Sequence, residues 1–388
     1  MSFPNKFFAL TPHCTLKHLE KPYLYDIEKD DLYELSQDAF EFFVKCSQGK
    51  CPAVKKEGEE FIQFCLAENL IIFSEVPIKR ELTLSPSPIP SLRYLEFQIT
   101  DRCNLRCQHC YVGDSRNQDL SFERIEQVLK EFEDVQGLRL LLSGGEPLTH
   151  PQFWKINEVL KKYAFRSVLL SNGTLITKKV AQRLQVHEVQ ISLDGMREGH
   201  ESLRGKGAFK KALQAIDYLQ EADIRVSIAT MVHQRNLKEF DELASLIQSK
   251  KIEEWNVDAP CMAGRLEENR EFWVAPSAGG RFLQYGYGGG LHCSEKNATC
   301  GAHLCAILPN SNVCKCGLFS QEPVGSVEEG IRACWERIPR IPLKDLICNC
   351  TELEECRGGC RFRAKYFGNL YQPDPFQCYA RRVLKGGE

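Results

Sequence analysis

Three closely spaced cysteines constrain this chain more than any other feature of its sequence. Cys103, Cys107 and Cys110 follow a C-x3-C-x2-C pattern directly after a strand-like run at residues 94–100. A compact loop with this spacing can aim three thiolates at one centre, and thiolates are preferred ligands of soft metals and iron–sulfur clusters. In a four-iron cluster, three cysteine ligands leave one iron open for a further ligand. A structural zinc site is the alternative interpretation.

Size and charge exclude several classes of function. The 388 residues suffice for two or three domains, and 43% hydrophobic with 26% charged residues is typical of globular proteins. The net charge of −2 gives no support for bulk attraction to nucleic acid or membranes. We expect no transmembrane helix, because no run of about 20 apolar residues occurs. The N-terminus lacks the basic and apolar pattern of a secretory signal.

The 19 cysteines are the outlier of the composition. Without an export signal, a disulfide-bonded secreted protein is not expected. Metal or cluster ligation in a reducing cytoplasm explains the cysteine content better. We therefore expect a cytoplasmic protein, in an anoxic or well-protected environment.

Residues 1–84 are predicted to form a small α+β unit. Residues 23–27 and 31–35 alternate apolar and polar side chains around a short turn, which predicts a β-hairpin. Ser36 can cap the helix that follows, and a second helix leads to a short strand at residues 70–73. The cysteines of this unit show no tight ligand spacing, and we expect Cys46 and Cys65 to pack in its core. The four are Cys14, Cys46, Cys51 and Cys65.

A parallel sheet is predicted after a proline-rich linker at residues 85–91, where alternating prolines favour an extended, semi-rigid spacer. Between residues 92 and 265, strand-like runs alternate with helical patterns, which indicates βα units. The strand-like runs are residues 94–100, 138–143, 166–171, 188–194, 224–231 and 252–257. Ligands of such folds gather at the carboxyl ends of the strands, where the motifs of this chain also lie.

Two further motifs follow strands of this sheet. A Ser-Gly-Gly-Glu-Pro run ends the second strand, and paired glycines let backbone approach a ligand closely. A Ser-Leu-Asp-Gly run ends the fourth strand, although its aspartate could instead cap a helix. The candidate binding residues of these motifs, with the arginine that follows, are Gly144, Gly145, Glu146, Ser192, Asp194 and Arg204.

These motifs together resemble the radical S-adenosylmethionine (SAM) enzymes, and the cysteine-rich residues 266–388 resemble their SPASM domain, which carries two auxiliary clusters. The resemblance implies a partial (β/α)6 TIM-like barrel at residues 92–265. Residues 1–84 resemble the winged-helix-like leader-recognition (RRE-like) domain that is fused to many peptide maturases. A cap that only packs on the catalytic domain is the alternative for that unit.

The resemblance also implies cofactors and their ligands. Three 4Fe-4S clusters are expected, one of them on Cys103, Cys107 and Cys110 with SAM on its open iron. The glycine-rich motif, Ser192 and Arg204 would contact SAM, with His109 and Tyr111 nearby. The implied auxiliary ligands are Cys293, Cys300, Cys316 and Cys360 for one cluster, and Cys348, Cys350, Cys356 and Cys378 for the other.

Some of these assignments stay open. Cys305 and Cys314 are additional cysteines that could replace an implied ligand or could pack in the core. Zinc is the alternative metal for the last third, because its cysteine spacings also suit zinc. Cys261 is expected to pack, although it follows the sixth strand and could face the active site.

By resemblance, the expected function is maturation of a ribosomally synthesised precursor peptide through a 5′-deoxyadenosyl radical, with formation of a thioether or a carbon–carbon crosslink. The expected partners are the leader segment of that peptide and an electron donor of the flavodoxin or ferredoxin type.

One alternative is a small-molecule enzyme of haem-variant or cofactor synthesis. Another is a maturase of protein residues, against which Gly317 argues, since those enzymes carry an aspartate after the corresponding cysteine. An iron–sulfur scaffold would have no use for the SAM motifs. No catalytic base is assigned.

Overall fold

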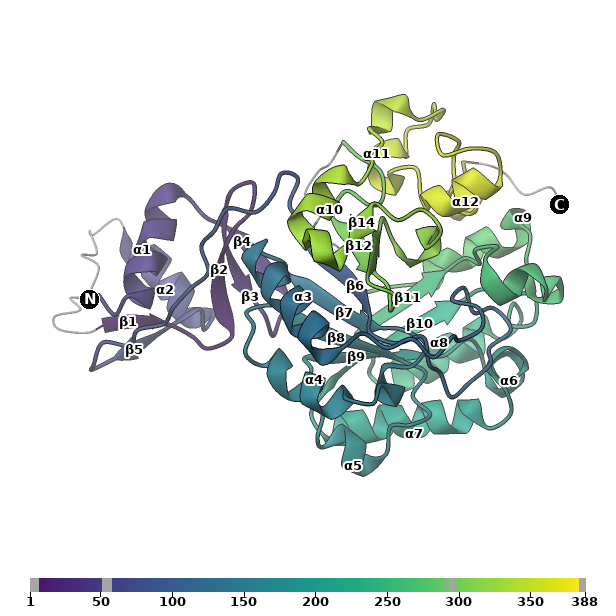
Figure 1. Cartoon of the computed structure of the whole chain (residues 1–388), viewed down its shortest axis with the longest axis horizontal. Coiled ribbons are helices and arrows are strands. Elements are labelled where there is room, and N and C mark those ends of the chain that lie inside the picture. The colour runs from purple at the N-terminus through teal and green to yellow at the C-terminus, as the bar shows by residue number, and fades with distance from the viewer. Residues whose placement is uncertain (1–6, 51–57, 291, 293–296, 384–388) are drawn as a thin grey trace.

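The computed structural model describes residues 7–50, 58–290, 292 and 297–383. Within these residues the chain forms an N-terminal unit, a central parallel sheet with its helices, and a cysteine-rich C-terminal part (Figure 1). None of the helices in this described part is long and apolar enough to cross a membrane.

The central sheet confirms the six predicted parallel strands. They lie side by side in sequence order, and each neighbouring pair is parallel. The strands are β6 (Tyr94–Gln98), β7 (Arg139–Ser143), β8 (Arg166–Ser171), β9 (Glu188–Ser192), β10 (Arg225–Met231) and β11 (Glu254–Asp258). Their carboxyl ends therefore meet at one edge of the sheet, as the motif positions require.

Helices follow the strands and cover the outer face of the sheet (Figure 1). They are α3 (Phe122–Asp134), α4 (Phe153–Leu160), α5 (Lys178–Ala181), α6 (Arg197–Arg204), α7 (Ala208–Glu221) and α8 (Phe240–Ser249). In α3, the side chain of Ser121 accepts from Arg124 N, which caps the helix. Ile125, Leu129 and Phe132 are completely buried, as their spacing predicts for one helix face.

The sheet does not end where the sequence placed its domain boundary. β12 (Leu304–Ile307) adds to the edge of the sheet parallel to β6, and β13 (Asn312–Cys314) and β14 (Gly325–Ser326) continue it in antiparallel order. The cysteine-rich part therefore shares the core of the barrel. Sequence analysis missed β12 because its four residues lie among ligand-like cysteines and give little periodicity.

Short helices make up most of the remaining C-terminal part (Figure 1). The α-helices are α9 (Pro276–Gly279), α10 (Ile331–Arg337), α11 (Leu353–Cys356), α12 (Arg361–Tyr366) and α13 (Pro375–Ala380). Among the described residues, the named 3-10 helices are η2 (Pro147–Thr149), η3 (Gly264–Glu267), η4 (Arg270–Phe272), η5 (Gly280–Tyr285), η6 (Gly317–Phe319), η7 (Val327–Glu329) and η8 (Leu343–Asp345).

The N-terminal unit contains the predicted hairpin and two strands that were not predicted. Its elements are β1 (Phe7–Leu10), β2 (Cys14–His18), β3 (Pro22–Asp26), β4 (Asp31–Glu34), α1 (Gln37–Ser47), α2 (Glu59–Ala67) and β5 (Ile71–Ser74). β3 and β4 form the hairpin, and Ser36 caps α1 by accepting from Ala39 N. β2 extends the hairpin to three strands, whereas β1 pairs with β5 across the unit. The terms winged-helix-like and RRE-like stay predictions.

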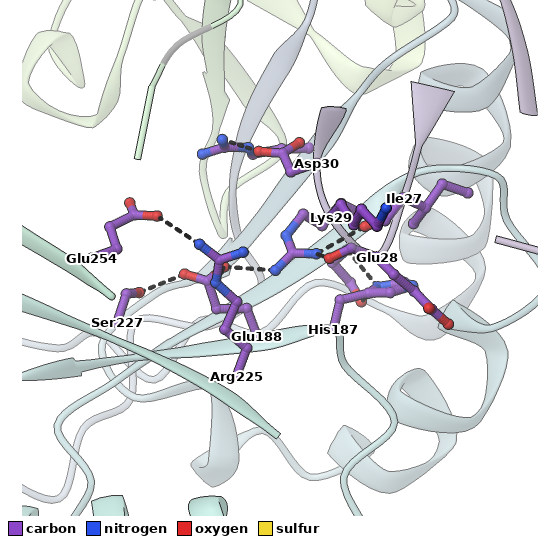
Figure 2. A network of polar contacts seen from close by, with 12 residues as sticks. Ile27, Glu28, Lys29, Asp30, His187, Glu188, Arg225, Ser227 and Glu254 are labelled. Carbon is purple, nitrogen blue, oxygen red and sulfur yellow. Dashed lines mark hydrogen bonds and ion pairs between the residues drawn. The ribbon is translucent and has the colours of Figure 1, made fainter. Parts of the chain in front are cut away.

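The turn of that hairpin is docked under the barrel, at the amino ends of its strands (Figure 2). Arg166, the first residue of β8, donates to the carbonyls of Ile27 (2.8 Å) and Glu28 (2.6 Å). The same guanidinium forms a buried ion pair with Glu188 at 2.8 Å. One arginine thus links the sheet to the N-terminal unit, and a second ion pair joins Asp30 to Arg139.

The proline-rich segment, predicted to be an extended, semi-rigid spacer, is bound to other parts of the chain. Ser87 N donates to His18 O at 2.9 Å, and the indole of Trp335 donates to Pro90 O at 2.7 Å. Ser87 and Pro88 are buried. Segments far along the chain hold this stretch in place, so the N-terminal unit and the barrel form one packed structure.

We predict that Arg166→Met lowers the free energy of unfolding by about 3–5 kcal/mol, because it leaves the carboxylate of Glu188 buried without its closest cation. Denaturant unfolding measures the change, and limited proteolysis should cut the N-terminal unit faster. Lys178→Met is the control, since Lys178 forms an exposed ion pair with Glu221 that solvent screens and that contributes little to stability. Equal effects of the two substitutions would contradict the role given to Arg166.

Candidate active site

A cavity of about 440 Å³ opens at the carboxyl ends of the barrel strands. Four of the predicted binding residues line it, together with one predicted auxiliary ligand and further residues outside the predicted set. The predicted residues are His109, Tyr111, Asp194, Arg204 and Cys316. The others include Glu96, Gln190, Met231, Asn256, Asp258 and Cys261. Gly144, Gly145, Glu146 and Ser192 do not line this cavity.

The glycine-rich loop after β7 holds the cysteine loop by backbone hydrogen bonds. Gly145 N donates to Thr100 O and Glu146 N donates to Arg102 O, both at 2.8 Å. A Cβ atom on Gly144 would lie 2.2 Å from Thr100 O, and one on Gly145 would lie 2.3 Å from Arg102 O. Only glycine permits this approach, so the paired glycines position the start of the cysteine loop.

The carboxylate of Glu146 is completely buried and is bound by the end of β8. It accepts from Ser171 Oγ at 3.0 and 3.1 Å and from Asn172 N at 2.9 Å. Burial raises the pKa of Glu146 to about 7, although these hydrogen bonds lower it. The side chain thus connects two strand ends, and its contact with SAM stays a prediction.

The three loop thiols lie near one another beside the cavity. Burial, together with smaller contributions from the charges of Cys107 and Cys110, raises the pKa of Cys103 to about 11. A segment from the end of the barrel supports the loop, since Arg265 N donates to Cys110 O at 3.0 Å. A Cβ atom on Gly264 would lie 2.3 Å from the same carbonyl oxygen. The donor set is one that suits a cluster.

Asp194 and Arg204 form a buried ion pair at the cavity wall. Asp194 also accepts from Met231 N at 2.7 Å, and Arg204 Nη1 lies 4.0 Å from Cys107 Sγ. Burial alone would raise the pKa of Asp194, but the guanidinium of Arg204 holds it well below its usual range. Asp194 does not cap a helix, because α6 begins after Met196 without a side-chain cap. The pair fixes a cation next to the cysteine loop.

His109 presents a polar atom without a hydrogen-bonding partner. Its Nδ1 is buried and unpaired within the described residues. Burial and the nearby charge of Arg204 lower the pKa of His109 to about 3, so the ring is neutral near pH 7. Buried polar atoms are normally satisfied by protein, water or ligand. An orphan nitrogen at the cavity therefore fits a polar ligand such as SAM.

Glu96 is a site residue that the sequence analysis missed. Its Oε1 accepts from Tyr111 Oη and Gln98 Nε2, both at 2.8 Å, and its Oε2 accepts from Gly317 N at 2.9 Å. A Cβ atom on Gly317 would lie 2.4 Å from Glu96 Oε1. The carboxylate thus occupies the space of a side chain after Cys316. A polar residue at an inward position of β6 was the signal available in the sequence.

Three predicted ligands of the first auxiliary cluster come together at the cavity. Burial and the charges of Cys300 and Cys360 raise the pKa of Cys316. Cys261, which was expected to pack, forms a hydrogen bond with Cys360 and lines the cavity. That bond lowers the pKa of Cys360 to about 7. Cys293, the fourth predicted ligand, lies outside the described residues.

The predicted ligands of the second auxiliary cluster also lie near one another. Burial, together with the charges of the other three thiols, raises the pKa of Cys378 to about 11. These three are Cys348, Cys350 and Cys356. Cys305 and Cys314 are completely buried in β12 and β13, where they pack in the core.

The spread of these thiols argues against a single zinc ion. Within the described residues, no three of the cysteine sulfurs lie within 4.8 Å of one another. Thiolates around one tetrahedral zinc, with bonds of about 2.3 Å, lie about 3.8 Å apart. Wider groups of three or four thiols suit larger iron–sulfur clusters.

Comparisons with known proteins agree with this geometry. Residues 97–247 match the family model "Radical SAM superfamily". The chain is 31% identical to the AdoMet-dependent heme synthase of Methanosarcina barkeri over 56% of its own length and 64% of that protein, just under two thirds. It is 27% identical to the mycofactocin maturase MftC of Mycolicibacterium smegmatis over 72% of this chain and 81% of that protein.

A solved structure has the same fold over nearly the whole chain. SuiB of Streptococcus suis, bound to its precursor peptide SuiA, superposes with a TM-score of 0.69. The match covers 95% of this chain and 99% of SuiB, at 14% identity. It shows the fold, including the presence of an N-terminal unit before the barrel.

We predict that Gly145→Ala reduces bound iron by about a third if three four-iron clusters are present, because the new Cβ pushes the cysteine loop out of place. Iron per chain after anaerobic reconstitution measures the loss. Gly290→Ala is the matched control, since nothing lies within 4 Å of its Cβ position. Full iron loading of Gly145→Ala would show that the close approach is dispensable.

Arg204→Ala should weaken SAM binding about 10- to 100-fold while iron content is unchanged, because a charge-assisted contact to the carboxylate of SAM is lost. Equilibrium binding of SAM to the reconstituted protein measures the effect. Arg106→Ala is the control, because Arg106 pairs with Asp114 at the exposed side of the same loop. Wild-type affinity in Arg204→Ala would remove Arg204 from the SAM site.

Proposed function

We propose that this chain, an enzyme of the radical SAM superfamily, is a maturase that installs a thioether or a carbon–carbon crosslink in a ribosomally synthesised precursor peptide. The observation that carries the proposal is an N-terminal unit in which the outer edge of β4 is unpaired within the described residues, docked on a barrel whose cavity is lined by Cys261 and Cys316 and lies beside the cysteine loop. The likeness to SuiB, which was solved with a precursor peptide, extends over this unit.

The residues around the cavity fit the cofactors of this chemistry. Cys103, Cys107 and Cys110 would hold a 4Fe-4S cluster, and Arg204 and His109 would contact SAM. When bound, these groups supply a 5′-deoxyadenosyl radical that takes a hydrogen atom from the substrate. We assign two auxiliary 4Fe-4S clusters to the other thiol groups. The proposal also includes an electron donor of the flavodoxin or ferredoxin type and an anoxic cytoplasm.

A leader peptide would bind at the outer edge of β4. Within the described residues β4 pairs only with β3, and Leu35 N donates to Pro22 O. Hydrogen-bonding groups alternate along an antiparallel strand, so those of Leu32 and Glu34 face away from β3. An extended peptide can add to such an edge as a further strand.

Two aromatic side chains would flank the bound leader. The rings of Tyr33 and Phe64 are 6.3 Å apart and edge-to-face, and Phe64 is 47% exposed. They join β4 to α2 and offer an apolar contact for alternate leader side chains. Backbone bonds at the edge would supply affinity, and this contact would supply specificity.

The core of the peptide would enter the cavity and meet Glu96. Asp194 and Asp258, which also line the cavity, are paired with Arg204 and Arg363. Glu96 bonds to neutral donors and forms no ion pair within the described residues. It is therefore the carboxylate most available to a polar or cationic group of the substrate.

A second candidate is a small-molecule enzyme related to haem synthesis. The observation in its favour is the 31% identity to the heme synthase, which is higher than the identity to MftC but covers less of this chain. In that case the N-terminal unit would be a structural cap, and the edge of β4 would have no ligand.

Substitution at the β4 edge tests the proposal more sharply than removal of the N-terminal unit, which would expose Arg166 and Arg139. Glu34→Pro deletes one outward N–H, whereas Glu34→Ala keeps it and removes the same charge. With a synthetic candidate precursor peptide, Glu34→Pro should weaken binding about 5- to 10-fold, the value of one hydrogen bond. Titration calorimetry and mass spectrometry of the product measure binding and modification.

SAM cleavage without peptide should stay at the wild-type rate in both Glu34 variants, because every SAM motif lies beyond the N-terminal unit. Equal binding and full modification by Glu34→Pro and Glu34→Ala would reject β4 as the leader site. If no encoded peptide binds the wild-type protein, the small-molecule candidate takes first place.

A further inference from the structure

A compact group of ligand atoms lies outside the cavity, in the N-terminal unit. The ligand atoms of His13, Cys14 and Asp26 all lie within 4.8 Å of one another, and no other such group occurs in the described part of the chain. Cys14 begins β2 and is the cross-strand partner of Asp26, which ends β3. Directly opposed residues of an antiparallel pair present their side chains on one face, and His13 precedes Cys14 in the chain.

The carboxylate of Asp26 supplies independent evidence for a ligand. Its Oδ1 accepts from Glu28 N and Lys29 N at 3.0 Å, so this oxygen stabilises the turn. Its Oδ2 is buried and has no hydrogen-bonding partner, and the residue is 0% exposed. Leaving a buried carboxylate oxygen unpaired is costly. The unpaired Oδ2 faces the other ligand atoms, since it lies 3.7 Å from His13 Nε2.

We propose that His13 Nε2, Cys14 Sγ and Asp26 Oδ2 bind a zinc ion, with water as the fourth ligand. Imidazole, thiolate and carboxylate are the three protein ligand types of zinc. At zinc bond lengths, tetrahedral neighbours lie about 3.3–3.7 Å apart, close to the observed separation of His13 and Asp26. This site is independent of the proposed function and of the cluster cysteines.

Neighbouring charges complete the site. Glu28 Oε2 lies 3.9 Å from His13 Nδ1, on the side of the ring away from Asp26. Carboxylates beside the second ring nitrogen commonly orient histidines that bind metals. Zinc binding releases the proton of Cys14, and the resulting thiolate and the carboxylate balance the charge of the ion. Arg80, which donates to Cys14 O at 2.7 Å, lies near the thiolate.

The position of the site gives it a structural role. Asp26 immediately precedes the turn at residues 27–30, which carries the contacts to Arg166 and Arg139 (Figure 2). An ion that ties the start of β2 to the end of β3 would hold this turn in the conformation that docks under the barrel. Zinc would thus brace the joint between the N-terminal unit and the barrel.

Metal analysis of the full-length, cluster-reconstituted protein tests the proposal. After anaerobic purification from zinc-supplemented medium, we expect about one zinc per chain. X-ray absorption at the zinc edge should show one sulfur and three nitrogen or oxygen neighbours, which distinguishes this site from zinc in cysteine-only sites. His13→Gln and Asp26→Asn should both remove the zinc and leave the iron content unchanged.

Cys46→Ala is the matched control, because Cys46 is a buried cysteine of the same unit and should not affect zinc. Circular dichroism of His13→Gln, whose side chain is at the edge of the site, checks that the fold survives. Absence of zinc from the wild-type protein overturns the proposal. So does zinc that persists in both variants, or a zinc shell of sulfur alone.

Discussion

Two backbone hydrogen bonds between the loop after β7 and the cysteine loop determine whether this active site can form. They join Gly145 and Glu146 to the carbonyls of Thr100 and Arg102, and they need an approach that only glycine permits. The buried carboxylate of Glu146 then ties the same loop to the end of β8. The thiols are therefore positioned by backbone geometry before any cofactor binds. The ion pair between Asp194 and Arg204, which follow β9, lies beside them.

The two ends of the barrel carry different polar groups and have different roles. The amino ends carry Arg166 and Arg139, whose contacts with the turn at residues 27–30 hold the N-terminal unit in place. The carboxyl ends carry the thiols and the orphan nitrogen of His109. The contacts at the first end contribute to stability, whereas the groups at the second end remain available to ligands. The same strands thus serve assembly at one end and chemistry at the other.

Local sequence patterns predicted the barrel well and the long-range contacts poorly. β8 and the Ser36 cap follow directly from alternation and capping chemistry, which involve neighbouring residues. The pairing of β1 with β5 and of β12 with β6 depends on partners far along the chain, which periodicity does not identify. The cluster ligands of the last third stay a prediction from the resemblance. Cys261 lines the cavity, as its position after the sixth strand allowed, whereas Glu96 enters the site only through the fold. The partners of Glu146 could not be read from its motif, because they belong to another strand.

The N-terminal unit docks at the end of the barrel opposite to the cavity, and under the proposed function this would give a peptide substrate a minimum length. β8 has six residues and spans about 20 Å at 3.3 Å per residue. A chain held at β4 must cover at least that distance before a residue can enter the cavity, which takes about six extended residues. Such an enzyme would act as a molecular ruler, selecting its target residue by distance from the bound segment as well as by the chemistry of the side chain. Precursors with a shorter spacer could not reach the cavity.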